Sequence, residues 1–224
     1  SRNDDFQALV INLAKLANNA TDIETLNSLA FPNTQRTVAE EITHNIATIG
    51  ENMMLRRMQK IQVNKGAVVP YIHNATADGM GRIGVLVALE SDASSEVLAS
   101  LGKQIAMHVA ATKPASLSVE SLDPSMVARE REVLIEQAKE SGKPQEIAEK
   151  MVEGRIRKFY QEVVLLEQTF VIDGESRVAD VIQKTAKEAG SDITLTEFGL
   201  FVLGDGIEKE ETDFAAEVAA QLSK

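Results

Sequence analysis

Apolar residues recur at every third or fourth position along most of the chain, a spacing that puts them on one face of an α-helix. Residues 4–19 show the pattern first, with Leu9, Leu13 and Leu16 on a single stripe. Gly50 is expected to end a later helix, because glycine readily adopts the left-handed conformation of a C-terminal cap. The same spacing predicts further helices over residues 22–29, 38–49, 95–111, 178–189 and 213–222.

Val and Ile are concentrated in a second kind of segment, in which the helical spacing is lost. The predicted strands cover residues 54–63, 67–73, 83–90, 163–172 and 194–203. Turn-forming residues at 64–66 and 77–79 separate the first three of them. Because strand-rich and helix-rich blocks are segregated along the chain, the pattern predicts an α+β fold rather than an alternating α/β fold.

Residues 125–161 contain two highly charged helical arms joined by a tight turn at 141–144. Each arm has only a narrow apolar stripe. The stripe residues are Val127, Leu134 and Ala138 in the first arm and Ala148, Val152, Ile156, Phe159 and Val163 in the second. Narrow stripes on charged arms are typical of an antiparallel hairpin that projects from the body, although an ordinary pair of surface helices is an alternative.

The chain carries a formal charge of −11, contains no Cys and is only 4% aromatic. Without Cys it has no disulfide scaffold, no thiolate metal site and no cysteine nucleophile. Binding of nucleic acid is not expected, since it needs clustered Lys and Arg or aromatic rings that stack on bases. No apolar stretch approaches the ~20 residues that span a bilayer. These properties predict an acidic cytoplasmic protein that does not bind membranes.

Residues 79–84 match the G-x-G-x-x-G pattern of dinucleotide-binding loops. In such a loop a strand precedes the glycines and a helix follows, so that helix N–H groups meet the pyrophosphate. Here a predicted strand follows instead, which favours a hairpin connection. A nucleotide-binding enzyme built on this motif is the alternative, and equilibrium dialysis with NAD or ATP is expected to show no binding.

The three His residues are spread along the chain without the i, i+3 or i+4 spacing of a helical metal site. His44 and His108 fall on predicted helices, where a satisfied structural role is the simpler interpretation. His73 ends a predicted strand beside a glycine-rich loop, a place where exposed functional side chains are common. The residues alone therefore predict a non-enzymatic interaction protein without a metal site.

Several strings resemble, in the same order, the signatures of the bacterial elongation factor Ts family. The first is Ile49-Gly50-Glu51-Asn52, which runs on to a pair of arginines at 56–57. The others are at residues 82–87, 105–111, 113–114, 141–155, 206–209 and 212–219. Together the strings extend over most of the chain, so the resemblance concerns the whole sequence rather than one motif.

The resemblance implies a guanine-nucleotide exchange factor for elongation factor Tu, acting in translation elongation. Such a protein binds the GTPase in its nucleotide-free or GDP form and promotes GDP release; it is not an enzyme and needs no cofactor. The implied architecture is two small α/β core subdomains, a coiled-coil hairpin and a C-terminal helical module. The implied bounds are 1–65 for an incomplete first subdomain, 66–117 with 166–206 for the second, 118–165 for the hairpin and 207–224 for the module.

The resemblance also implies which residues contact elongation factor Tu. Those expected at its GTPase domain are Ile49, Gly50 and His73, together with Asp213, Phe214 and Val218 of the terminal helix. Val171 and Ile172 correspond to an apolar pair that docks on the third domain of the GTPase. The alternative function is a non-catalytic assembly protein, with the hairpin mediating interaction or a homodimer.

In the family, an amino-terminal domain and then a Thr-Asp-Phe motif precede the matching region. Both are missing from these 224 residues, as are two strands of the first subdomain. The same tripeptide at 212–214 belongs to the C-terminal module and is not expected to replace the motif, whose Phe wedges into the GTPase. Binding with slow GDP release is therefore expected. Either the sequence is a piece of a longer protein, or the natural protein is shorter than its family.

Overall fold

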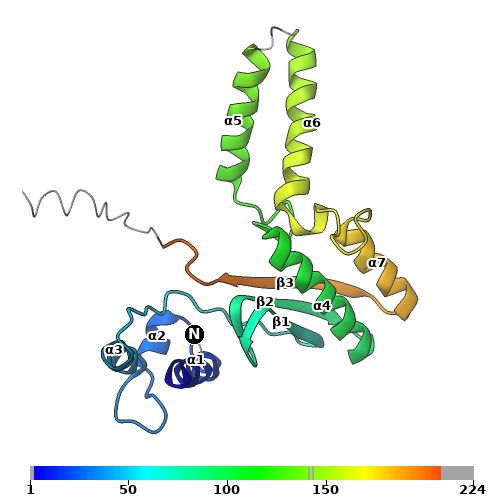
Figure 1. Ribbon diagram of the computed structural model, residues 1–224. Coiled ribbons are helices and arrows are strands. Elements are labelled where there is room, and N and C mark those ends of the chain that lie inside the picture. The colour runs from blue at the N-terminus through cyan, green and yellow to red at the C-terminus, as the bar shows by residue number, and fades with distance from the viewer. Residues whose placement is uncertain (1–2, 141, 143, 208–224) are drawn as a thin grey trace, which may run out of the picture.

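The computed structural model describes residues 3–140, 142 and 144–207 and combines helices with one antiparallel sheet. Three helices form an amino-terminal cluster, and the sheet lies beside it (Figure 1). The cluster contains α1 (Asp4–Ala17), α2 (Ile23–Ser28) and α3 (Val38–Ile49). The three strands of the sheet are β1 (Gly66–Ala77), β2 (Met80–Ser91) and β3 (Ile193–Val202), in the order β1-β2-β3. The α+β class predicted from the sequence is confirmed.

Two helices, α4 (Ser95–Thr112) and α7 (Val178–Ala189), pack on the sheet. A further pair, α5 (Pro124–Glu140) and α6 (Gln145–Val163), lies side by side and projects away from it (Figure 1). We call this pair the arm. None of the helices in the described part of the chain is both long and apolar enough to cross a membrane.

Capping residues explain where α3 begins and ends. The Thr37 side chain accepts from the Glu40 N–H, and the Glu40 carboxylate accepts from the Thr37 N–H at 2.7 Å, which forms a capping box. This backbone bond is the main cause of the lowered pKa of Glu40. At the other end Gly50 has a φ of 80°, in the left-handed region predicted for it. The apolar face of α3 is thereby presented to α1 and α2, and the shared core is Leu9, Leu26, Phe31, Val38 and Ile42.

The main core lies between the sheet and α4. Val85, Val87 and Leu89 alternate along β2 and pack with Leu101 and Ile105 of α4. Gly79 lies between β1 and β2, and Gly81 and Gly84 lie in β2, where they pair with β1. The hairpin interpretation of that motif is confirmed. The opposite face of the sheet borders an apolar groove of about 600 Å³. Its lining includes residues of α1, of segment 53–61 and of the sheet.

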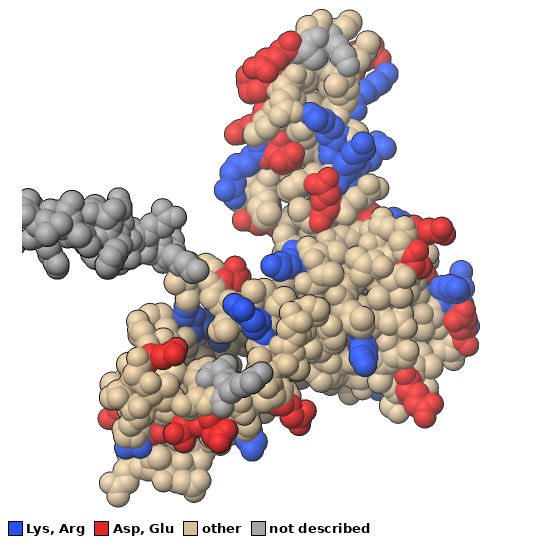
Figure 2. Space-filling view, viewed as in Figure 1, with Lys and Arg blue, Asp and Glu red and all other residues tan. Residues whose placement is uncertain are grey.

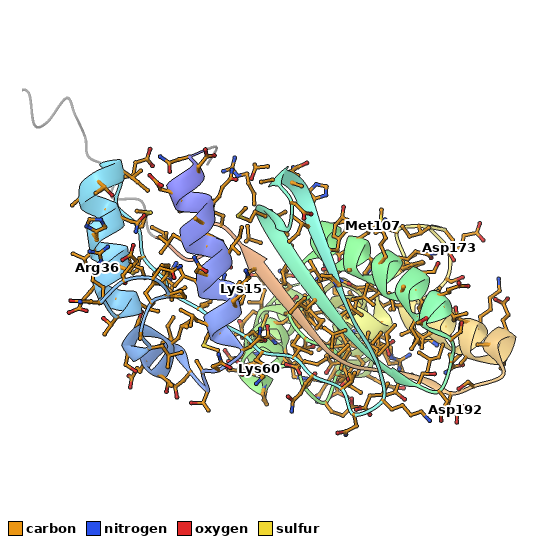
Figure 3. The ribbon with its side chains drawn as sticks, turned by 90° about the horizontal axis from the view of Figure 1, so that it is seen from below. Lys15, Arg36, Lys60, Met107, Asp173 and Asp192 are labelled. Carbon is orange, nitrogen blue, oxygen red and sulfur yellow. The ribbon has the colours of Figure 1, made fainter. Side chains whose placement is uncertain are left out.

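The strand predicted over residues 54–63 is wrong. The backbone of this segment is not paired with any described strand. Side-chain hydrogen bonds attach the segment to its neighbours instead. Gln59 Nε2 donates to the Glu197 carboxylate at 2.9 Å, and Lys60 Nζ donates to the Asn18 carbonyl at 2.8 Å. Figure 3 shows Lys60 near Lys15, at the end of α1. The β-forming residues of segment 54–63 favour an extended backbone. A β-strand also needs an adjacent strand to which its backbone N–H and C=O groups can bond.

The strand predicted over residues 163–172 is also wrong. Helix α6 continues to Val163, a 3₁₀ turn follows at Leu165–Glu167, and a loop begins after it. Val164, Leu165 and Phe170 are almost completely buried, so the apolar run reflects a buried connection. Periodicity alone does not distinguish such a run from a buried strand. The helix predicted over 213–222 lies outside the described residues.

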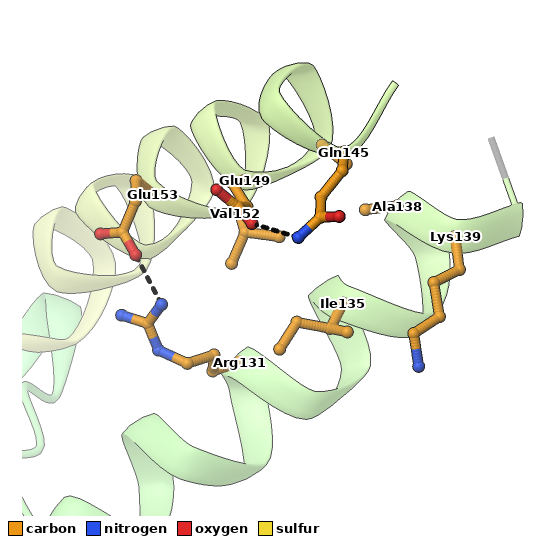
Figure 4. Close-up of a pocket in the computed structure, with 9 residues that line it drawn as sticks. Arg131, Ile135, Ala138, Lys139, Gln145, Glu149, Val152 and Glu153 are labelled. Carbon is orange, nitrogen blue, oxygen red and sulfur yellow. Dashed lines mark hydrogen bonds and ion pairs between the residues drawn. The ribbon is translucent and has the colours of Figure 1, made fainter. Parts of the chain in front are cut away.

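The arm has a small core of its own. Leu134 and Ala138 of α5 pack with Val152 and Ile156 of α6, and Ala148 and Tyr160 are partly buried against them. The predicted stripes are confirmed at these positions except Tyr160, whereas their other members, Val127, Phe159 and Val163, are not part of this core. Outside this core, Arg131 Nη1 lies 2.5 Å from a Glu153 oxygen, and Figure 4 shows this ion pair joining the two helices. Figure 2 shows Lys and Arg interspersed with Asp and Glu along the visible face of the arm.

The close approach of α4 to β1 depends on Gly102. A Cβ at this position would lie 2.5 Å from Val69 Cγ2, too close for a real contact. We expect Gly102→Ala to lower the free energy of unfolding by about 1–3 kcal/mol in urea titrations. The matched control is Gly154→Ala on α6, where no atom lies within 4 Å of the added Cβ. That change should stabilise the protein by up to about 1 kcal/mol, and equal effects of the two variants would contradict this packing.

Candidate partner-binding surface

The loop at residues 168–177 presents two neighbouring apolar side chains to solvent. Val171 is 47% exposed and Ile172 is 49% exposed, whereas the preceding Phe170 is 2% exposed and belongs to the main core. Figure 3 shows Asp173 of this loop near the part of α4 that carries Met107. Adjacent exposed apolar side chains are among the surface features found at protein contact sites.

Short-range hydrogen bonds hold the loop in shape. The Phe170 N–H donates to the Ser176 carbonyl at 2.7 Å, and the Gly174 N–H donates to the Phe170 carbonyl at 2.8 Å. The Asp173 carboxylate accepts from the N–H groups of Glu175 and Ser176 at 3.0 and 3.1 Å. These bonds, that from Glu175 first, lower the pKa of Asp173. The exposed pair therefore stands on an ordered turn.

His108 of α4 lies directly beneath this loop. Its side chain is fully buried, and its ring centroid is 5.6 Å from that of Phe170. The backbone N–H of Val171 donates to His108 Nδ1 at 3.2 Å. Because Nδ1 accepts a hydrogen bond, it carries no proton, and Nε2 carries the proton of the neutral ring. The helical position expected of His108 is confirmed, and its contacts reach well beyond its own helix.

The second ring nitrogen extends the contact to the arm. His108 Nε2 lies 2.8 Å from Gln168 Oε1, and Gln168 Nε2 donates to the Glu162 carbonyl at 2.8 Å. Thr112 Oγ1 lies 3.0 Å from the same Gln168 oxygen. Burial lowers the pKa of His108, with partial opposition from the bond to Gln168. We call Val171 N–H, His108, Gln168 and the Glu162 carbonyl the His108 network.

The other expected contact residues lie elsewhere. Ile49 and Gly50 form the end of α3, where Ile49 is half-buried and Gly50 is exposed. His73 is exposed but lies within β1, opposite Ile83, because the strand continues to Ala77; the expectation that it ends the strand is wrong. Its Nδ1 is 3.0 Å from the Tyr71 hydroxyl.

The structure thus brings Val171 and Ile172 together on one loop and puts Ile49, Gly50 and His73 on other elements. Asp213, Phe214 and Val218 lie outside the described residues. Among the residues that are described, no group of three or more His, Asp or Glu side chains is placed to hold a metal ion. The sequence interpretation missed the role of Gln168, whose only signal was a polar residue inside an apolar run.

The chain matches one protein family and several of its members along most of its length. The family described as Elongation factor TS matches residues 1–205. Elongation factor Ts of Rhodospirillum rubrum is 56% identical, over 100% of this chain and 73% of its own length. Its counterpart in Rhodospirillum centenum is 52% identical over 98% of this chain and 72% of its own length. That of Gluconobacter oxydans is 56% identical over 98% and 70%.

These similarities place the chain among the elongation factors of protein synthesis. Within that class, it belongs to the elongation factor Ts family. The resemblance seen in residues 49–57 and in the later strings is thereby confirmed.

Acid should weaken the fold through His108. The folded state holds the pKa of His108 below its ordinary value of 6.5, so the contribution of the neutral ring is complete above about pH 6.5. It is lost as pH falls from there toward the folded-state pKa. We expect the free energy of unfolding in urea titrations to fall between pH 7.5 and 5.5, by at most ~1.4 kcal/mol per pH unit for this one group.

Two variants isolate this contribution from that of the carboxyl groups. His108→Asn should remove the pH dependence of unfolding over this range. His44→Asn, a change at an exposed position of α3, should leave it in place. An unchanged slope in His108→Asn would contradict a neutral buried ring.

Proposed function

We propose that the protein is a guanine-nucleotide exchange factor for elongation factor Tu. Membership of the elongation factor Ts family supports this function. The observation that supports this function most is the pair Val171 and Ile172. Both side chains are about half exposed, on a loop that the buried His108 network anchors from its inner side. An interaction factor needs such a preformed apolar surface, because binding then costs little ordering of the chain.

In this proposal the exchange reaction is a change of conformation in the partner rather than chemistry by this chain. The factor binds elongation factor Tu better when GDP is absent, and it therefore lowers the affinity of the GTPase for GDP. Linkage requires GDP to weaken the binding of the factor by the same ratio. No metal or nucleotide held by the factor is required, since the Mg²⁺ and phosphate contacts that change belong to the GTPase.

The proposed contacts are distributed over the molecule. Val171 and Ile172 dock on the third domain of elongation factor Tu, while Ile49, Gly50 and His73 face its GTPase domain. The C-terminal module, with Asp213, Phe214 and Val218, adds a further contact to that domain. In the proposed domain division, 1–65 belongs to a first core subdomain, 66–117 with 166–206 to a second, 118–165 to the coiled-coil hairpin and 207–224 to the module.

Truncation of the exposed pair tests the proposal. We expect Ile172→Ala to weaken binding to elongation factor Tu about tenfold, since a half-exposed Ile buried on docking contributes roughly 1–2 kcal/mol. The measurement is release of a fluorescent GDP from elongation factor Tu in stopped flow, with the factor at increasing concentration. The half-maximal concentration should rise in the variant.

A matched control lies on the arm. Ile147 is 48% exposed, close to the 49% of Ile172, so Ile147→Ala removes the same side chain from an equally exposed place. It should leave the concentration dependence unchanged. A loss confined to Ile147→Ala would favour an assembly function of the arm. A wild-type chain that neither binds elongation factor Tu nor accelerates GDP release to any extent would overturn the proposal.

A further inference from the structure

We infer that His108 is a positioning residue for partner binding: its two ring nitrogens fix the backbone under Val171 and Ile172 and tie that backbone to the base of the arm. The inference rests on the proposed function, because it explains how the same exposed pair is held for docking. His108 itself is fully buried, so it acts through the loop without touching a partner.

His108 Nδ1 holds the loop through the backbone of Val171. Val171 donates its backbone N–H into the protein, to His108 Nδ1 at 3.2 Å, while its side chain remains 47% exposed. Phe170, one residue earlier, inserts its ring beside the imidazole. Two successive residues are thereby anchored on the inner side of the loop. This anchoring fixes the direction in which the side chains of Val171 and Ile172 leave the surface.

His108 Nε2 connects the loop to the arm through Gln168. Gln168 is 4% exposed; its oxygen meets His108 Nε2, and its nitrogen donates to the Glu162 carbonyl. Glu162 lies in the last turn of α6, where backbone carbonyls have no partner within the helix. Gln168 supplies that partner. The loop and the arm therefore share one amide side chain, and a displacement of either strains the other.

The buried setting makes these bonds selective. A buried polar atom that loses its partner leaves an unsatisfied group, which is costlier than the bond itself is stabilising. The ring can satisfy both neighbours only as a neutral imidazole with the proton on Nε2. A protonated ring would direct an N–H at the Val171 N–H, so this contact is a specific one rather than general packing.

Two amide substitutions separate the two nitrogens. In His108→Asn the side-chain oxygen takes the place of Nδ1 and can accept from Val171, whereas the contact with Gln168 is lost. In His108→Gln the side-chain nitrogen reaches the place of Nε2, and the acceptor for Val171 is lost. We expect His108→Asn to bind elongation factor Tu within about threefold of wild type and His108→Gln to bind at least tenfold more weakly.

Urea unfolding of both variants provides the structural comparison. His108→Gln leaves the Val171 N–H unmatched, whereas in His108→Asn the Gln168 oxygen keeps its bond from Thr112 Oγ1. Both variants should therefore be less stable than the wild type, and His108→Gln should be the less stable of the two. Binding is therefore compared under conditions where both variants are fully folded, so that a difference in affinity does not arise from unfolding. Equal affinities of the two amide variants under these conditions would overturn the inference.

A double-mutant cycle tests whether His108 acts through the exposed pair. If it positions Ile172, then His108→Gln should weaken binding much less in an Ile172→Ala background than in the wild type. Additive losses would contradict the inference. The matched pair for the cycle is His108→Gln with Ile147→Ala on the arm, for which additive behaviour is expected.

Amide hydrogen exchange of the free protein keeps the inference separate from the proposed function. In the wild type the Val171 N–H should exchange slowly; it should exchange at least tenfold faster in His108→Gln and remain slow in His108→Asn. If the wild-type chain neither binds elongation factor Tu nor accelerates GDP release but this pattern holds, the proposed function fails while the anchoring stands. If GDP release is accelerated but Val171 exchanges equally in both variants, the inference on His108 fails alone.

Discussion

A neutral imidazole cut off from water exists in two tautomers, and the hydrogen bonds around His108 select one of them. Its Nδ1 must accept, because the Val171 N–H points at it, and its Nε2 must therefore donate to Gln168. This constraint joins α4, the exposed loop and the last turn of α6 at one buried point. The surface proposed to meet elongation factor Tu is ordered from beneath, by groups that the partner never touches.

The rest of the fold supports that point. Gly102 lets α4 lie close against β1, which fixes the helix that carries His108. The amino-terminal cluster is joined to the sheet by side chains of the extended segment. There Arg56 donates to the backbone carbonyls of Asp205 and Gly206 at 2.6 and 3.1 Å, and Gln59 reaches Glu197. These links are side-chain contacts and not strand pairing, and the cluster and the sheet have separate cores.

The sequence predicted those elements whose signals are local. Helix α3 has its cap at Thr37 and its stop at Gly50, and the β1–β2 hairpin turns at residues 78–79, so propensity and pattern agree there. The strand predictions for residues 54–63 and 163–172 are wrong, because the conformation of these segments depends on neighbours that are distant in the chain. Val171 and Ile172 are predicted as contact residues by the family resemblance and not by periodicity. In the His108 network, His108 contacts Gln168 and Val171, which lie 60 and 63 residues further along the chain, and no local pattern encodes that pairing.

In the proposed function, the 168–177 loop is the docking surface for elongation factor Tu. Photo-cross-linking tests it most directly, with a benzophenone amino acid in place of Ile172 and, in a parallel sample, of Ile147 on the arm. Nucleotide-free elongation factor Tu should be captured efficiently from position 172, with the cross-link in its third domain, and much less from position 147. Capture from position 147 with none from 172, or a cross-link from 172 outside the third domain, would contradict the account.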